Sequence, residues 1–199
     1  MYGMNSSDYY ETRPSFEELF IETCKLWARR STCQRLQTAA VIVKNNNIVS
    51  IGYNGVPSNN THCWDFWREF YNCAMGTAII SAAMQEFYES IVRDLGFNIS
   101  ILKKENIQSY DDFVKSDCFG VLHHYWSDKN ELHAELNAIL QAEHSVVGAT
   151  LYTLYSPCRQ CAKSIIAARV SRVVYHEQYK RDSEGLTLLQ KNNVIVNKI

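Results

Sequence analysis

The sequence predicts an α/β fold, a sandwich of helices around a mixed β-sheet. Its second half alternates between strand-like and helix-like segments, which is typical of this class: a strand at 150–155, a helix at 158–168, a strand at 172–176, a helix at 185–191 and a short strand at 194–196. In the first half, Thr38–Lys44 and Ile48–Tyr53 flank three consecutive asparagines. Because asparagine tolerates the left-handed backbone of tight turns, these two segments should form a hairpin.

Two further helices are predicted before the alternating half. Ser15 precedes Glu18 by three positions, which is the spacing of a capping box at a helix start. Apolar residues recur at helical intervals from Phe16 onward, so this helix should run to about Arg30. A second helix is expected over residues 131–142.

The middle of the chain is the least regular part. Between residues 59 and 127 only the segment 78–92 has helical periodicity, and the remainder mixes aromatic and charged residues without a repeat. We therefore expect a single domain over residues 1–199 with an insertion at about 64–120, and a loose N-terminal arm at 1–13.

Composition limits the class of partner. The chain has 199 residues, 46% apolar and 21% charged, with a formal net charge of −1. This is enough apolar material for a sizeable core. Proteins that hold nucleic-acid polymers usually carry a clear positive excess, so the charge counts against a polymer substrate. It does not count against a single nucleotide.

The sequence also bears on compartment. It contains no apolar run of membrane-span length and no apolar stretch typical of a signal peptide near its start, so a cytoplasmic protein is expected. Its seven cysteines, an odd number, are better interpreted as thiols or metal ligands than as a disulfide framework.

Two short motifs indicate a metal site: H-A-E at 133–135 and P-C-R-Q-C at 157–161. Cys158 and Cys161 stand three positions apart, so both lie on one face of a first helical turn, where free N–H groups favour thiolates. Two thiolates and the imidazole of His133 suit zinc, and three protein ligands leave the fourth position for water, whose pKa zinc lowers. A redox pair and a structural histidine are the alternatives, but neither explains both motifs together.

Glu135 is the candidate proton carrier beside this metal. It lies only two residues after His133, too close in sequence to join the same tetrahedron easily. H-x-E with P-C-x-x-C resembles the signature of zinc deaminases. In such an enzyme, hydrolytic attack at C4 of cytosine requires a proton at N3, and the amine must depart as ammonia. One carboxylate can perform these transfers.

The chain resembles the deoxycytidylate deaminases, especially those of phage type. The resemblance rests on HAELNAI at 133–139, GYNG at 52–55, AVIVK at 40–44 and SPCRQCAK at 156–163, and it covers about 31–63 and 118–199. It implies a cytidine-deaminase-like fold, a three-layer α/β/α sandwich with a mixed five-stranded sheet. It also implies conversion of dCMP to dUMP and ammonia for thymidylate synthesis, in the host cytoplasm if the chain is of phage or viral origin.

The resemblance further implies substrate contacts and regulation. Asn54 and Ala134 are expected among the substrate-binding residues, and Arg35, two places after a cysteine near the first strand, is a candidate for the substrate phosphate. A solvated surface charge is the alternative for Arg35. Family members are often homo-oligomers regulated by dCTP and dTTP, and GYNG is tied to that control. Thr38 and Ala39 stand where the family has Val-Gly. This departure affects the expected regulation by dCTP and dTTP more than the expected deamination.

Phage relatives can carry a second zinc, and the matching residues here are Cys33, Cys63 and His123. His62 and His124 lie beside two of these, so either could supply a fourth ligand. The alternative is a set of ordinary buried thiols and an imidazole.

Three other functions remain open from the residues alone. The motifs are shared with enzymes that deaminate cytosine or adenine in nucleic acid, which need a basic groove and stacking aromatics. Deamination of dCTP is compatible with the same motifs. A non-catalytic nucleotide sensor that kept its zinc is a third alternative, although a sensor has no need of Glu135.

Overall fold

The computed structural model describes residues 13–100, 102 and 107–199, so the predicted arm lies outside the described residues except for Arg13. The chain divides into two compact units. The sheet unit comprises residues up to Ser31, Thr38–Asn54 and His133–Ile199, and the helical unit comprises Thr32–Gln37 and Gly55–Leu132. The helical unit includes more residues than the insertion expected at 64–120.

The sheet unit contains a mixed five-stranded sheet in the order β2-β1-β3-β4-β5. Strand β1 is antiparallel to both β2 and β3, whereas β3, β4 and β5 are mutually parallel. The mixed sheet predicted from the sequence is confirmed. The strand bounds are β1 (Ala39–Lys44), β2 (Asn47–Tyr53), β3 (Thr150–Tyr155), β4 (Arg172–Glu177) and β5 (Ile195–Lys198).

The hairpin between β1 and β2 turns on two asparagines. Asn45 and Asn46 both have positive φ angles, 51° and 59°, and asparagine is among the few residues that adopt this region at low cost. The turn therefore forms as the sequence predicts.

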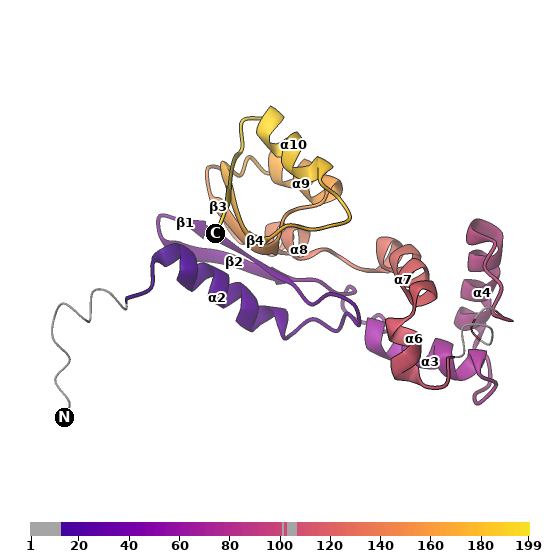
Figure 1. Ribbon diagram of the computed structural model, residues 1–199. Coiled ribbons are helices and arrows are strands. Elements are labelled where there is room, and N and C mark those ends of the chain that lie inside the picture. The colour runs from indigo at the N-terminus through magenta and orange to yellow at the C-terminus, as the bar shows by residue number, and fades with distance from the viewer. Residues whose placement is uncertain (1–12, 101, 103–106) are drawn as a thin grey trace, which may run out of the picture. The chain divides into compact units, whose positions relative to one another are not determined.

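Helices cover both faces of the sheet (Figure 1). Helix α2 (Phe16–Ala28) packs on the face formed by Val41 and Val43 of β1. The alternating residues Ala40 and Ile42 point to the opposite face. There they pack with residues of α8 (Ala134–Leu140), α9 (Arg159–Ala167) and α10 (Glu184–Lys191). The predicted three-layer α/β/α sandwich is thus confirmed.

Most helix bounds agree with the sequence to within a few residues. The capping box of Ser15 and Glu18 is formed, and α2 ends at Ala28, near the predicted Arg30. The helix predicted at 131–142 is shorter and begins at Ala134. It cannot begin at 131 because Leu132 exchanges two backbone hydrogen bonds with Gly55 in a local β-bridge.

The helical unit is built around aromatic side chains. Its longer helices are α3 (Cys63–Ala74), α4 (Ala82–Leu95), α6 (Tyr110–Lys115) and α7 (Asp117–Asn130). Trp67 and Phe70 of α3 are fully buried against Phe113 and Phe119. The sequence predicted only α4, because aromatic residues have weak helix propensity. Helix α3 was missed although its buried residues, Cys63, Trp67, Phe70 and Cys73, recur at helical spacing. In the described part of the chain, no helix is long and apolar enough to cross a membrane.

Candidate active site and a second cysteine–histidine cluster

The two sequence motifs meet in the sheet unit. His133 is the N-cap residue of α8, Cys158 is the N-cap residue of α9, and Cys161 lies in the first turn of α9. The Nδ1 atom of His133 is 3.4 Å from the Sγ of Cys158 and 3.3 Å from the Sγ of Cys161. The N-terminal ends of α8 and α9 therefore bring one nitrogen and two sulfur ligands together.

The spacing of these three atoms fits zinc. With Zn–S bonds of about 2.3 Å and Zn–N bonds of about 2.0–2.1 Å, neighbouring ligands of a tetrahedral ion are about 3.6 Å apart. The three ligand atoms lie within 4.8 Å of one another. The donor set is the one that zinc prefers, and it leaves a fourth position for a small molecule.

One thiol of the pair is prepared to bind metal as a thiolate. A hydrogen bond from Cys161, assisted by His133, lowers the pKa of Cys158. The pKa of Cys161 is raised, first by its interaction with Cys158 and then by burial. Because metals bind the thiolate form, Cys158 supplies the first negative charge of the site.

Glu135 lies beside these ligands. The residue is buried, with 6% of its surface exposed, and burial raises the pKa of its carboxyl group. Its side chain hydrogen bonds with that of Cys161. A buried carboxyl group with a raised pKa holds a proton more readily than an exposed one, and the predicted proton carrier requires this property.

One residue that the sequence did not single out, Asp182, holds the Cys158 loop. The carboxylate of Asp182 accepts a hydrogen bond from the backbone N–H of Arg159, at 2.6 Å, and also from those of Glu184 and Gly185. Within the described chain, neither N-cap side chain, Cys158 or Ser183, caps its own helix. Asp182 therefore serves both helix starts. The D-S-E-G segment at 182–185 could have signalled a helix start, but not its contact with residue 159.

The expected substrate-binding residues differ in their surroundings. Asn54 is buried, and its Oδ1 accepts a hydrogen bond from the backbone N–H of Thr38 at 3.0 Å, which fixes the orientation of its amide. Ala134 is fully buried at the first position of α8. Arg35 belongs to the helical unit and is exposed; its guanidinium lies against Gly120, where an added Cβ would be 2.5 Å from one terminal nitrogen.

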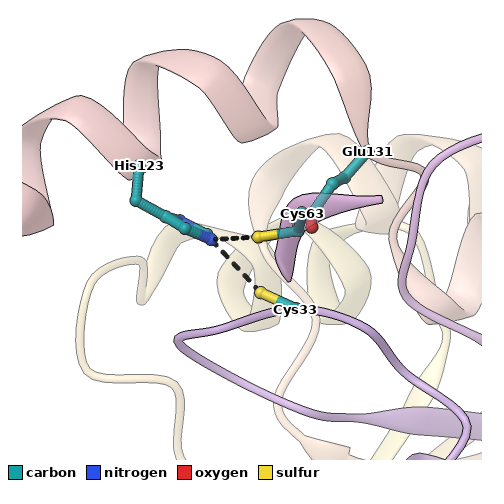
Figure 2. Close-up of side chains that lie close together, drawn as sticks. All are labelled: Cys33, Cys63, His123 and Glu131. Carbon is teal, nitrogen blue, oxygen red and sulfur yellow. Dashed lines mark hydrogen bonds between the residues drawn. The ribbon is translucent and has the colours of Figure 1, made fainter. Parts of the chain in front are cut away.

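The helical unit contains a second cluster of potential ligands (Figure 2). The Nε2 atom of His123 is 3.3 Å from the Sγ of Cys33 and 3.4 Å from the Sγ of Cys63. Glu131 supplies a carboxylate oxygen, and all four ligand atoms lie within 4.8 Å of one another. These distances also fit tetrahedral zinc.

The fourth member of this cluster differs from the sequence expectation. His124 follows His123 on α7, so helical geometry turns its side chain about 100° away. It is 61% exposed and lies 3.7 Å from Asp128. His62 is exposed and lies near Thr32. Glu131, which ends α7 eight residues after His123, completes the cluster instead.

The second cluster is part of the aromatic core. Cys33, Cys63 and His123 are all buried. The imidazole of His123 stacks on the indole of Trp67, with ring centroids 6.1 Å apart. A hydrogen bond from Cys63, with support from His123, lowers the pKa of Cys33. Four protein ligands in a buried setting are the pattern of a structural zinc site.

Comparisons with known proteins agree with this geometry. Residues 14–177 match the model of the cytidine and deoxycytidylate deaminase zinc-binding region. The chain is 33% identical over 177 residues to the deoxycytidylate deaminase of Enterobacteria phage T4, covering 86% of this chain and 83% of the relative. It is 26% identical over 168 residues to the deoxycytidylate deaminase of Mycobacterium phage D29, covering 84% and 98%.

The fold has a solved counterpart. The crystal structure of dCMP deaminase from cyanophage S-TIM5 in complex with dCMP and dUMP superposes with a TM-score of 0.59 at 24% identity, covering 94% of this chain and 99% of that one. The similarity at this identity concerns the fold. From the match over most of its length and the similarity to the phage T4 protein, the chain belongs to the cytidine and deoxycytidylate deaminase family.

Proposed function

We propose that this protein is a zinc-dependent enzyme that hydrolyses dCMP to dUMP and ammonia. The observation that carries the proposal is the convergence of His133, Cys158 and Cys161 beside the buried carboxyl group of Glu135. The imidazole nitrogen of His133 is 3.4 Å from the sulfur of Cys158 and 3.3 Å from that of Cys161. The phage relatives, which are named deoxycytidylate deaminases, support dCMP as the substrate.

In this proposal His133, Cys158 and Cys161 would hold the zinc. When bound there, the ion supplies a water molecule of lowered pKa. Glu135 would take one proton from the attacking water and deliver it to N3 of the cytosine ring as the water oxygen forms its bond to C4. Glu135 would then move the remaining proton from the new C4 hydroxyl to the amino group, so that the C4–N bond breaks, ammonia leaves and C4 keeps a carbonyl oxygen. Its raised pKa suits both halves of this exchange.

Asn54 is proposed to contact the nucleoside. Because its Oδ1 accepts a hydrogen bond from the backbone N–H of Thr38, the orientation of this amide is fixed by the protein. Ala134 would lie along the base as the residue between His133 and Glu135. Arg35 is proposed to hold the substrate phosphate, and the nucleotide dCMP would then bind more tightly than deoxycytidine.

A second zinc on Cys33, Cys63, His123 and Glu131 is also proposed. Its ligand set is closed, so its role would be to stabilise the helical unit and not to activate water. Metal analysis of pure protein should then find about two zinc ions per chain. Regulation by dCTP and dTTP, assembly into a homo-oligomer and a cytoplasmic location complete the proposal.

The test is an ammonia-release screen over cytidine, dCMP, CMP, dCTP and a single-stranded oligonucleotide. The proposal requires dCMP to have the highest kcat/KM. A preference for dCTP would move the assignment to a triphosphate deaminase, and turnover of the oligonucleotide alone would move it to nucleic acid. No release from any substrate by zinc-loaded protein would support a sensor and refute the enzyme.

A further inference from the structure

Strand β2 touches the backbone of the helix that carries His133 and Glu135. At Gly52, an added Cβ would lie 2.2 Å from the backbone nitrogen of Ala138, 2.5 Å from the carbonyl oxygen of Ala134 and 2.8 Å from the Cα of Ala138. All three are backbone atoms, so none can give way by a side-chain rotation. Glycine inside a strand commonly marks such a close approach of another backbone.

Two hydrogen bonds flank this contact. The hydroxyl of Ser50 donates to the carbonyl oxygen of Ala138 at 2.5 Å. The Nδ2 of Asn137 donates to the carbonyl oxygen of Tyr53 at 2.8 Å, and Gln141 donates to the Oδ1 of Asn137 at 2.6 Å. Strand β2 is therefore joined to α8 by Ser50, Gly52 and Asn137, which we call the β2–α8 latch.

The latch determines where the helix lies because α8 is short. It has seven residues, and an isolated helix of that length is unstable in water. Its position must come from contacts, and the contacts of the latch are made at Ala134, Asn137 and Ala138. Ala134 lies between His133 and Glu135 in the chain, so any shift of α8 moves the imidazole and the carboxyl group together.

We propose that the β2–α8 latch is a positioning device for the reaction, which sets the place of Glu135 and the His133 imidazole relative to Cys158 and Cys161. This inference rests on the proposed deaminase function. The two glycines of the GYNG segment differ in this respect. Gly52 makes the close contact, whereas an added Cβ at Gly55 would have no heavy atom of the described residues within 4 Å apart from Gly55 itself and its two chain neighbours.

The loss of turnover expected for Gly52→Ala follows from the distances between its added Cβ and the backbone of α8. To restore an ordinary contact of 3.4 Å at Ala138, α8 would have to move by about 1 Å. A misplacement of about 1 Å can reduce turnover by about 10²-fold. Gly52→Ala should therefore lower kcat for dCMP by about 10²-fold and change KM much less, because Asn54 and Arg35, the proposed nucleoside and phosphate contacts, do not belong to α8.

The experiment compares Gly52→Ala, Asn137→Asp and the control Gly55→Ala in full-length protein without added effector nucleotide. Asn137→Asp keeps the shape of the side chain and removes the donor to Tyr53, so it tests the latch without adding an atom if Gly52→Ala does not fold. We expect a drop of about 10-fold in kcat for Asn137→Asp, as for the loss of one partly buried hydrogen bond, and wild-type kcat for Gly55→Ala.

A second readout does not depend on activity. Cobalt(II) in place of zinc should give an absorption spectrum that changes in Gly52→Ala and Asn137→Asp and stays as wild type in Gly55→Ala, since the His133 ligand moves only in the first two. If the wild type deaminates no substrate, the proposed function fails while the spectra still test the latch. Wild-type kcat and spectra in both latch variants, or a rise in KM alone, would overturn the inference.

Discussion

Asp182 allows a quantitative prediction from one side chain. Its carboxylate accepts backbone hydrogen bonds at the start of α9 and at the start of α10. In the described structure, the side chains of the N-cap residues Cys158 and Ser183 make no such capping hydrogen bond. Losing a helix cap costs typically about 1 kcal/mol. Asp182→Ala removes the cap of two helices, so the free energy of unfolding should fall by about 2 kcal/mol.

For a chain of this length, about 2 kcal/mol corresponds to a fall in Tm of about 4–8 °C. The same change should loosen the loop that carries Cys158, because the backbone N–H of Arg159, the residue that follows Cys158, donates its hydrogen bond to Asp182. Zinc should therefore be lost faster to a chelator. The assays are thermal denaturation followed by circular dichroism, and zinc release followed with a coloured chelator.

A matched control lies two residues away. Glu184 pairs with Arg159 across an exposed surface, where the two side chains are 66% and 59% exposed, and such pairs contribute little to stability. Glu184→Gln should therefore leave both Tm and zinc release close to wild type. Equal Tm values for Asp182→Ala and Glu184→Gln would show that Asp182 does not cap these helices, and the reasoning would fail.

Three further predictions concern the proposed sites. Glu135→Gln should keep zinc and fold but lose turnover by about 10²–10⁴-fold, and near-normal activity would assign proton transfer to another group. Arg35→Ala should raise KM for dCMP by about 10-fold to 150-fold, the value of one charge-assisted contact, and leave KM for deoxycytidine unchanged; equal losses would assign Arg35 to structure. Cys63→Ser should reduce zinc from about two per chain to about one and lower Tm, whereas His124→Ala should keep both ions; loss of zinc in His124→Ala would contradict the assignment of Glu131.

Where a site depends on residues close together in the chain, the sequence was sufficient to predict it. The pairing of Cys158 with Cys161 and the place of His133 and Glu135 at a helix start follow from helical geometry over one turn. The alternation of strands and helices likewise predicted the layered sheet, because each element shows its own hydrophobic period. The resemblance to a family then indicated that the two motifs meet.

Contacts between distant segments were decided only by the tertiary structure. Glu131 joins Cys33 and Cys63 because α7 ends at that position, and no local pattern separates it from His124. The roles of Gly52 and Asp182 depend on what packs against them, at Ala138 and Arg159. Helices α6 and α7 of the helical unit were missed for a related reason: their stability comes from aromatic side chains packed across helices, which a linear hydrophobic period does not report.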